Sequence, residues 1–137
     1  ILVPSLGREV KVGLAICMDI QWKDFAEGQE TNFELANFQL QEQTECLIFS
    51  SGWTDPNNSP DDKKRIYETL NCWAWRLTPI IESQMPKFTF ICSDRVGKEK
   101  ETSFIGSSCF IQIRPKVAIL GNLNHKEQNM LRMKVDL

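Results

Sequence analysis

The sequence predicts an α/β fold with a mixed sheet, because segments typical of strands alternate with segments typical of helices and are then followed by strands in succession. Strand-like runs end near residues 17 and 49, and each is followed by a loop and a helical pattern. Two later strands flank Arg114-Pro115-Lys116 and indicate a hairpin. The 137 residues, 42% of them hydrophobic, are enough for one compact domain, and no repeat or low-complexity tract divides them.

The first predicted strand, Lys11 to Cys17, is a mostly apolar run after the turn-prone Leu6-Gly7-Arg8. Its composition is typical of a strand buried on both faces. Residues 24–30 are polar and contain a glycine, which predicts a loop. Apolar side chains at helical spacing predict a helix over residues 32–43, and residues 47–49 predict a short buried strand.

The clearest helix signal follows the loop that residues 51–60 predict. Ser59 and Asp62 have the spacing of a capping box, and Pro60 stands at the first helical position. The helix should end before Pro79, because proline disfavours helical geometry in the residue that precedes it. Its apolar face is formed by Ile66, Leu70, Trp73 and Leu77.

The remaining elements are predominantly strands. Residues 88–92 predict a strand, and residues 93–103 predict a polar loop with Gly97 at its centre. Residues 108–113 and 117–120 predict the two arms of the hairpin. In the last segment, Leu131, Met133, Val135 and Leu137 alternate with polar residues, which predicts a half-solvated strand.

Composition excludes several classes of function. The 16 basic and 18 acidic residues are scattered, so no face resembles a phosphate-binding surface, and nucleic acid is not expected as a partner. Apolar stretches fall short of the roughly 18 residues of a membrane span, which predicts a soluble protein. The five cysteines are an odd number, lack zinc-site spacing and lie mostly in apolar runs. We therefore expect reduced thiols in the cytoplasm or nucleus, and neither a metal nor a cofactor.

Cys17 is the residue most suited to chemistry. It ends a buried strand, so rigid backbone would present its thiol at the sheet edge, where the N–H of Met18 can face a developing oxyanion. The alternative is an inert buried cysteine. The single histidine, His125, lies in a polar segment and is expected at the surface, so the base for Cys17 is not expected to be a histidine of this chain. No serine-hydrolase elbow, P-loop or dinucleotide-binding glycine motif is present.

Residues 11–20, Lys-Val-Gly-Leu-Ala-Ile-Cys-Met-Asp-Ile, resemble the nucleophile segment of the nitrilase superfamily of carbon–nitrogen hydrolases. Further blocks follow in the family's order. Residues 47–53 resemble its next strand and tryptophan-bearing exit loop, 95–97 its N-R-x-G block, 104–108 its F-x-G-x-S block, and 135–137 its closing strand.

One branch of the superfamily is especially similar. Eukaryotic protein N-terminal amidases are similar in four places: the sequence of residues 16–19, the loop at 51–53, the helix end at 75–79 and the position of Cys92. That branch hydrolyses the side-chain amide of N-terminal Asn or Gln of peptides and proteins and feeds the N-degron pathway. Other members of the same class, ω-amidase, nitrilase and carbamoylase, remain alternatives.

The resemblance implies an α-β-β-α sandwich, with residues 1–137 as the C-terminal portion of a single domain. It also implies a Glu base, an oxyanion-stabilising Lys and a Cys nucleophile, of which only Cys17 maps here. Glu9 and Lys11 are too close to Cys17 along its own strand to match the other two. The start at Ile1-Leu2-Val3, unlike a signal peptide, predicts preceding polypeptide that supplies them.

The resemblance also assigns roles to individual residues. Met18 contributes its backbone N–H to the oxyanion site, and its side chain has no chemical role. Asp19 either orients the turn or binds the substrate's α-amino group, and Trp53 either walls the substrate pocket or packs in the core. Asp94 stands where the family has Asn, so any donor role of that side chain would be lost. Trp73 and Trp75 are expected to pack.

A different class remains open, namely a non-catalytic remnant or interaction module, because Glu and Lys have no counterpart here. We expect the 137-residue chain alone to be inactive and poorly folded, since half a sandwich leaves sheet faces uncovered. The family commonly dimerises, so a homodimer is also implied.

Overall fold

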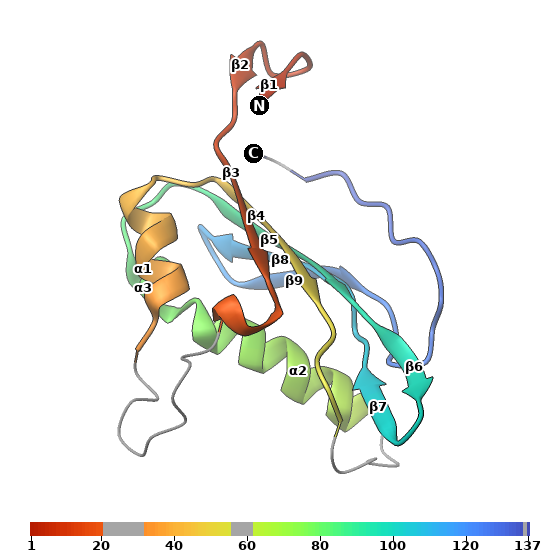
Figure 1. The fold of residues 1–137 in the computed structure, drawn as a ribbon. Helices are drawn as coiled ribbons and strands as arrows, with labels where there is room; N and C mark the ends of the chain where they lie inside the picture. The colour runs from red at the N-terminus through yellow and green to blue at the C-terminus, as the bar shows by residue number, and fades with distance from the viewer. Residues whose placement is uncertain (21–31, 56–61, 136) are drawn as a thin grey trace.

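The fold is built on one five-stranded mixed sheet with strand order β3-β4-β5-β8-β9 (Figure 1). The computed structural model describes residues 1–20, 32–55, 62–135 and 137. Strands β3, β4 and β5 are parallel, and β8 and β9 are antiparallel to their neighbours, as the predicted mixed sheet requires. The sheet comprises β3 (Val12–Ile16), β4 (Cys46–Ser51), β5 (Phe88–Asp94), β8 (Cys109–Arg114) and β9 (Ala118–Asn122).

Three helices cover one face of this sheet: α1 (Glu34–Gln41), α2 (Asp62–Arg76) and α3 (Thr78–Glu82). The predicted apolar face of α2 is confirmed, since Leu70, Trp73 and Leu77 are buried. Trp73 meets Phe49 of β4 edge to face at 5.4 Å, an aromatic contact that contributes about 0.5–1.5 kcal/mol beyond its buried area. α2 ends at Arg76, before Pro79 as predicted, and the proline then lies in the first turn of α3.

The other face of the sheet carries a row of apolar side chains in cross-strand register. The row runs Leu14, Ile48, Ile91 and Phe110, and then reaches Gly121 on β9. Leu14 is 77% exposed and Ile48 42%, whereas at the far end of the row Leu131 and Met133 lie against Gly121. The prediction that the strand at 11–17 is buried on both faces is therefore wrong within the described part of the chain.

A second hairpin corrects the predicted loop at residues 93–103. Strands β6 (Val96–Glu99) and β7 (Thr102–Ile105) pair antiparallel, with Gly97 opposite Phe104. Val96, Phe104 and Ile105 are their only large apolar residues and do not alternate with polar ones, so the pattern that signals a half-buried strand is missing. The hairpin predicted around residues 114–116 is confirmed as β8 and β9.

Two other expectations are corrected. Residues 131–135 alternate between half-buried and exposed side chains as predicted, but they form no strand with the described residues. His125 is only 3% exposed, not on the surface, because its backbone packs against Gly106. The predicted loop at 24–30 and the capping pair around Pro60 lie outside the described residues.

The chain begins with a small hairpin of β1 (Leu2–Val3) and β2 (Arg8–Glu9), joined by the predicted turn with Gly7 at φ 63°. In Figure 1 this hairpin projects beyond the starting end of β3. Among the helices described, none is both long and apolar enough to cross a membrane.

Candidate active site

Cys17 lies where β3 ends and the backbone turns sharply. Cys17–Ile20 form a 3-10 turn, η1, and Cys17 itself has φ 43°, a region that residues other than glycine seldom adopt. The carboxylate of Asp19 accepts the N–H of Ile16 at 2.8 Å and closes the turn onto the strand. The thiol is half-buried and does not belong to the core. A side chain so placed is presented by rigid backbone, which suits a nucleophile.

The ends of three parallel strands place the other sequence blocks at the same edge. Ile16 pairs with Ser50, and Ser51 of β4 pairs with Asp94 of β5. Because the carboxyl ends of parallel strands meet at one edge, Cys17, the loop after Ser51 and Asp94 lie along a common border of the sheet. Ligands of open α/β sheets bind beyond such carboxyl ends.

Asp94, the last residue of β5, forms hydrogen bonds with the segment after β4 and the segment before β8. Its Oδ1 accepts the N–H of Trp53 at 3.1 Å, and its backbone N–H donates to Ser108 Oγ at 2.9 Å. Its Oδ2 is buried and has no hydrogen-bond partner among the described residues. Burial raises the pKa of Asp94 to about 7, although the hydrogen bonds from Trp53, Ser51 and Arg95 act in the opposite direction.

The loop after β4 is fixed by the β6–β7 hairpin. Ile105 N–H donates to Trp53 O at 2.9 Å, and Asp55 N–H donates to Ser103 O at 2.9 Å. The Asp55 carboxylate also forms a buried ion pair with Arg65 of α2. These contacts hold the loop on both sides, between the hairpin and the helix layer.

The hairpin itself is fastened by Arg95, whose guanidinium lies 4.2 Å from the ring centroid of Phe104 and 2.7 Å from a Glu99 oxygen. The blocks at 47–53, 95–97 and 104–108, which are far apart in the sequence, are thus in mutual contact. Their order along the chain indicated no such contact.

The tryptophans have distinct environments. Trp53 meets Trp73 edge to face at 5.1 Å, so the packing role left open for Trp53 is observed on the helix side of the sheet. A part of Trp53 in substrate binding stays a prediction. Trp73 is buried as expected, but Trp75 is 46% exposed and contacts Phe33 and Arg76 on the surface.

The remaining assignments for η1 stay predictions in part. The hydrogen bond to Ile16 gives Asp19 the orienting role, and a substrate contact for it is untested by this geometry. The side chain of Met18 is 46% exposed, and the oxyanion role of its N–H stays a prediction.

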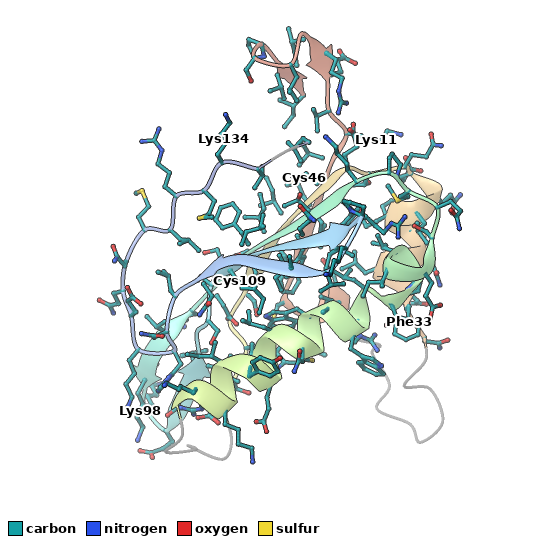
Figure 2. All side chains as sticks on the ribbon, turned by 180° about the vertical axis from the view of Figure 1, so that it is seen from behind. Lys11, Phe33, Cys46, Lys98, Cys109 and Lys134 are labelled. Atoms are coloured by element: carbon teal, nitrogen blue, oxygen red, sulfur yellow. The ribbon has the colours of Figure 1, made fainter. Side chains whose placement is uncertain are left out.

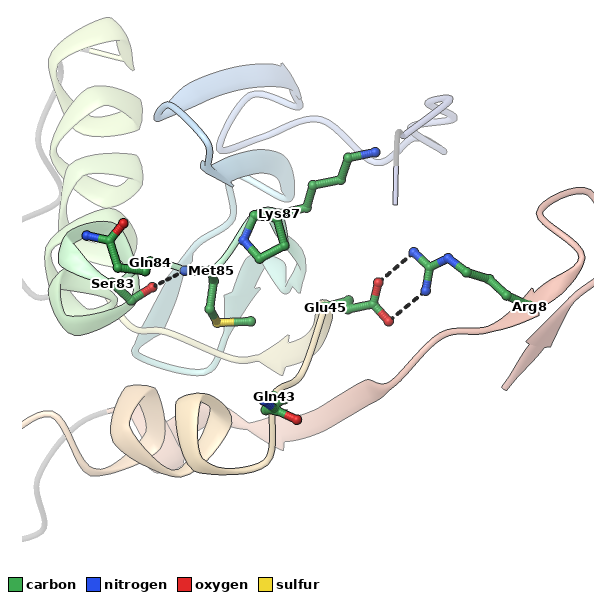
Figure 3. Close-up of a pocket in the computed structure, with 8 residues that line it drawn as sticks. Arg8, Gln43, Glu45, Ser83, Gln84, Met85 and Lys87 are labelled. Carbon is green, nitrogen blue, oxygen red and sulfur yellow. Dashed lines mark hydrogen bonds and ion pairs between the residues drawn. The ribbon is translucent and has the colours of Figure 1, made fainter.

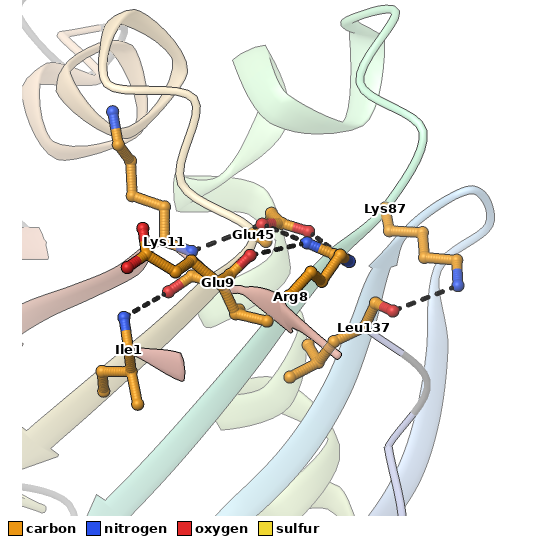
Figure 4. Close-up of polar contacts among 8 residues, drawn as sticks. Ile1, Arg8, Glu9, Lys11, Glu45, Lys87 and Leu137 are labelled. Atoms are coloured by element: carbon orange, nitrogen blue, oxygen red, sulfur yellow. Dashed lines mark hydrogen bonds and ion pairs between the residues drawn. The ribbon is translucent and has the colours of Figure 1, made fainter. Parts of the chain in front are cut away.

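Glu9 and Lys11 precede the start of β3, whereas Cys17 follows its end, so they lie at the opposite edge of the sheet from Cys17. Figure 2 labels Lys11, and Figure 4 shows Glu9 and Lys11 beside Glu45. Lys11 Nζ lies 3.7 Å from a Glu42 oxygen. The same edge holds a pocket lined by Arg8, Glu45 and residues 83–87 (Figure 3). There Arg8 and Glu45 form a two-bond pair of 2.6 and 3.0 Å, which lowers the pKa of Glu45. The charges of these two residues neutralise each other, and Lys87 is the third charged residue of the lining.

Arg76 is a residue that the sequence interpretation missed. It is 7% exposed and donates to the carbonyl oxygens of Ile20 and Asn32. The available signal was a basic residue three positions after Trp73 and one before Leu77, within the apolar face of the predicted helix. A charge in such a position has a specific partner more often than not. No group of three or more His, Cys, Asp or Glu side chains in the described segments is arranged to hold a metal ion.

Comparison with known proteins finds relatives both in sequence and in structure. The chain is 30% identical over 139 aligned positions to a curated "Protein N-terminal amidase" of Schizosaccharomyces pombe. The alignment covers 93% of this chain and 47% of that protein. The chain thus spans about half the length of the curated relative. Its structure superposes on a carbon-nitrogen hydrolase from Helicobacter pylori G27 with a TM-score of 0.58 at 20% identity, over 87% of this chain and 38% of the other. No family model matches the chain. In sequence and in fold, therefore, the chain resembles the nitrilase superfamily of carbon–nitrogen hydrolases, and it is similar to protein N-terminal amidase.

Proposed function

We propose that Cys17 is the nucleophile of a thiol amidohydrolase, and that residues 1–137 are the C-terminal portion of its carbon–nitrogen hydrolase domain. The observation that carries the proposal is the backbone of Cys17, which leaves a parallel strand with φ 43° at the border shared with the ends of β4 and β5. Uncommon backbone conformations of this kind cluster at functional sites. The likeness to the curated amidase supports the same assignment.

The reaction proceeds in two stages. A base removes the proton of the Cys17 thiol, the sulfur attacks the amide carbon, and a carbon–sulfur bond forms as the carbonyl oxygen becomes an oxyanion. The carbon–nitrogen bond then breaks and ammonia leaves with that proton, so an acyl-enzyme remains. Water adds to the thioester, the carbon–sulfur bond breaks, and the carboxylic acid and the thiol are released.

The base and the oxyanion-stabilising Lys belong, in this proposal, to polypeptide that precedes residue 1. Two observations support this division. The chain corresponds to 47% of the curated relative, and Glu9 and Lys11 lie at the wrong edge of the sheet to act on Cys17. The exposed apolar row beginning at Leu14 is a further feature of an incomplete sandwich.

The nucleophile is tested in the full-length protein. Cys17→Ala and Cys17→Ser should each reduce amidase turnover at least 10³-fold, because a member of a catalytic set that acts as a unit is lost. Cys72→Ala is a matched control, since Cys72 is also half-buried but lies on α2. Ammonia release is measured, and turnover that survives Cys17→Ala would refute the assignment.

We further propose that the substrate is the side-chain amide of an N-terminal Asn or Gln of a protein, whose hydrolysis feeds the N-degron pathway. The support is the likeness to protein N-terminal amidase. Asp19 and Trp53 are the candidate substrate contacts. Ammonia release from peptides with N-terminal Asn or Gln should exceed release from free amides, nitriles and carbamoyl compounds. The reverse order would favour an ω-amidase, nitrilase or carbamoylase.

A non-catalytic module is the second candidate, favoured by the distance of Glu9 and Lys11 from Cys17 along the sheet. The two candidates differ in one measurement, because only the amidohydrolase gives a Cys17-dependent acyl-enzyme. Intact mass spectrometry after mixing the full-length protein with substrate detects that adduct.

We also propose a cytoplasmic or nuclear location and a homodimeric state for the full-length protein. All five cysteines are free, and Cys92 faces Cys109 across β5 and β8 as a pair of thiols. The hydrogen bond from the Cys92 thiol to Cys109 and burial both raise the pKa of Cys92, so the Cys92 thiol is not primed to react. Imaging of a tagged protein and light scattering test the two proposals separately.

A further inference from the structure

Arg76, at the end of α2, contacts the turn that carries Cys17. Its Nε donates to the carbonyl oxygen of Ile20 at 2.6 Å, and its Nη2 donates to the carbonyl oxygen of Asn32 at 2.9 Å. Ile20 is the last residue of η1 and is itself 2% exposed. One buried guanidinium therefore joins the turn after Cys17 to the chain that leads into α1.

We infer that Arg76 is a positioning residue for the nucleophile, which fixes the 3-10 turn of Cys17 against α2 and so sets the direction of the thiol. The inference rests on the proposed function of Cys17. Arg76 does not touch the reacting atoms, so its effect acts through the backbone of η1.

The geometry suits an arginine for three reasons. First, the planar guanidinium presents two N–H groups in a fixed fork, and these reach two carbonyls that are separated along the chain. Second, a positive charge at the carboxyl end of a helical turn interacts favourably with the unpaired carbonyls there. Third, hydrogen bonds that involve a charged donor are shorter and stronger than neutral ones, which agrees with the 2.6 Å contact to Ile20.

Aromatic rings complete the environment of the guanidinium. Its carbon lies 5.5 Å from the ring centroid of Phe33 and 5.4 Å from that of Trp75, and the two rings meet edge to face at 5.6 Å. Figure 2 shows Phe33 at the end of α2 that α3 follows. Cation–π contacts of this kind are strongest where water is excluded. Burial lowers the pKa of Arg76 from its ordinary value, but the group remains a cation.

The consequence for catalysis is geometric. Asp19 closes η1 onto Ile16 at one end, and Arg76 holds Ile20 at the other, so both ends of the turn are tied. Loss of the hydrogen bond from Arg76 to Ile20 would let the turn shift. A displacement of about 1 Å at a reacting group can reduce the rate of the chemical step about 100-fold.

The test uses the full-length protein with Arg76→Met and Arg76→Lys. Arg114 is the matched control, because it also donates to backbone carbonyls, namely Met85 O at 2.9 Å, Ile81 O at 3.4 Å and Pro115 O at 3.4 Å, but lies at the opposite edge of the sheet. Two quantities are measured: kcat and KM for amide hydrolysis, and the rate of alkylation of Cys17 by iodoacetamide, read by mass spectrometry of the peptide that contains it.

Arg76→Met should lower kcat at least 10-fold with little change in KM, and it should change the alkylation rate of Cys17 by a similar factor. Arg76→Lys should recover part of both, since lysine keeps the charge and a donor but not the fork. Arg114→Met should leave both quantities within about twofold. If Arg76→Met does not fold, the kcat of Arg76→Lys relative to Arg114→Lys decides.

Equal losses at Arg76 and Arg114, or wild-type kcat and alkylation in the Arg76 variants, would overturn the inference. Its failure is distinct from failure of the proposed function. Turnover that persists in Cys17→Ala would refute the assignment of Cys17 as the nucleophile. Turnover that depends on Cys17 but does not change in the Arg76 variants would refute only the positioning role of Arg76.

Discussion

The backbone of Cys17 is held in a conformation that its side chain does not favour. A positive φ at a residue other than glycine costs on the order of 1–3 kcal/mol, so neighbouring contacts must maintain it. The hydrogen bond from Ile16 N–H to Asp19 and the one from Arg76 to Ile20 O provide such contacts. The hydrogen bonds of the residues around Cys17 therefore fix the conformation of its backbone.

Asp94 is a second residue whose environment decides its behaviour. Asp94 stands where the family has Asn, which predicted the loss of a hydrogen-bond donor. In the structure, the Asp94 side chain accepts hydrogen bonds. The guanidinium of the adjacent Arg95 turns away toward Glu99 and Phe104, so it leaves the buried carboxylate without an opposite charge from that neighbour.

The raised pKa of Asp94 predicts a pH-dependent stability. The folded protein holds the Asp94 proton up to about pH 7, whereas the ordinary pKa is 3.8. The contribution of Asp94 to the free energy of unfolding is therefore fully present below about pH 4 and is lost as pH rises to about 7. The free energy of unfolding changes by about 4 kcal/mol at most over this range. Asp94→Asn should remove that slope. Urea midpoints of the full-length protein between pH 4 and 8 measure it, and parallel curves for both proteins would contradict the prediction.

The β6–β7 hairpin and the loop after β4 act as one structural element. Gly106 follows the hairpin with φ 65°, and its N–H donates to Arg95 O at 2.9 Å. A Cβ at Gly106 would lie 2.8 Å from His125 O and 2.7 Å from Val96 Cγ1. The close approach of the segment around His125 thus depends on glycine at this position.

Gly106→Ala should destabilise the full-length protein by about 2–4 kcal/mol, because it combines backbone strain with overpacking. Gly7→Ala is the matched control, since Gly7 has a similar φ of 63° but no atom within 4 Å of an added Cβ. It should cost only about 1 kcal/mol, from strain alone. Thermal midpoints of both variants compare the two costs, and equal shifts would show that the contact with His125 is unimportant.

At the scale of the whole molecule, the two faces of the sheet differ. One face is covered by the three helices, whereas the row from Leu14 to Phe110 is exposed at its β3 end. Exposed apolar surface of this kind marks a site of association. An α-β-β-α sandwich would cover it with a second sheet.

The isolated 137-residue chain should therefore self-associate and lack amidase activity. Leu14→Lys combined with Ile48→Lys should reduce the association without restoring activity, because both side chains belong to the exposed row. Light scattering measures association, binding of a hydrophobic dye measures the exposed apolar surface, and ammonia release measures activity. A monomeric isolated chain with turnover abolished by Cys17→Ala would contradict this prediction.

The sequence by itself determined the local elements and the position of Cys17 at the end of a strand. Apolar spacing identified α2, and the apolar run before Cys17 identified β3, because these patterns depend on residues within a few positions of one another. The polar hairpin at β6 and β7 carried no such pattern, and the alternation at 131–135 did not by itself make a strand, since a strand also needs a partner.

Only the tertiary structure decided which residues meet. It brought Asp94 into hydrogen-bond contact with the Trp53 backbone, Arg95 over the ring of Phe104, and Arg76 against the turn after Cys17. These pairs are separated in the sequence and join elements whose neighbours are set by strand order. The physical reason is that residue patterns act locally, whereas hydrogen-bond partners, burial and pKa depend on how sheet edges and helix ends pack together.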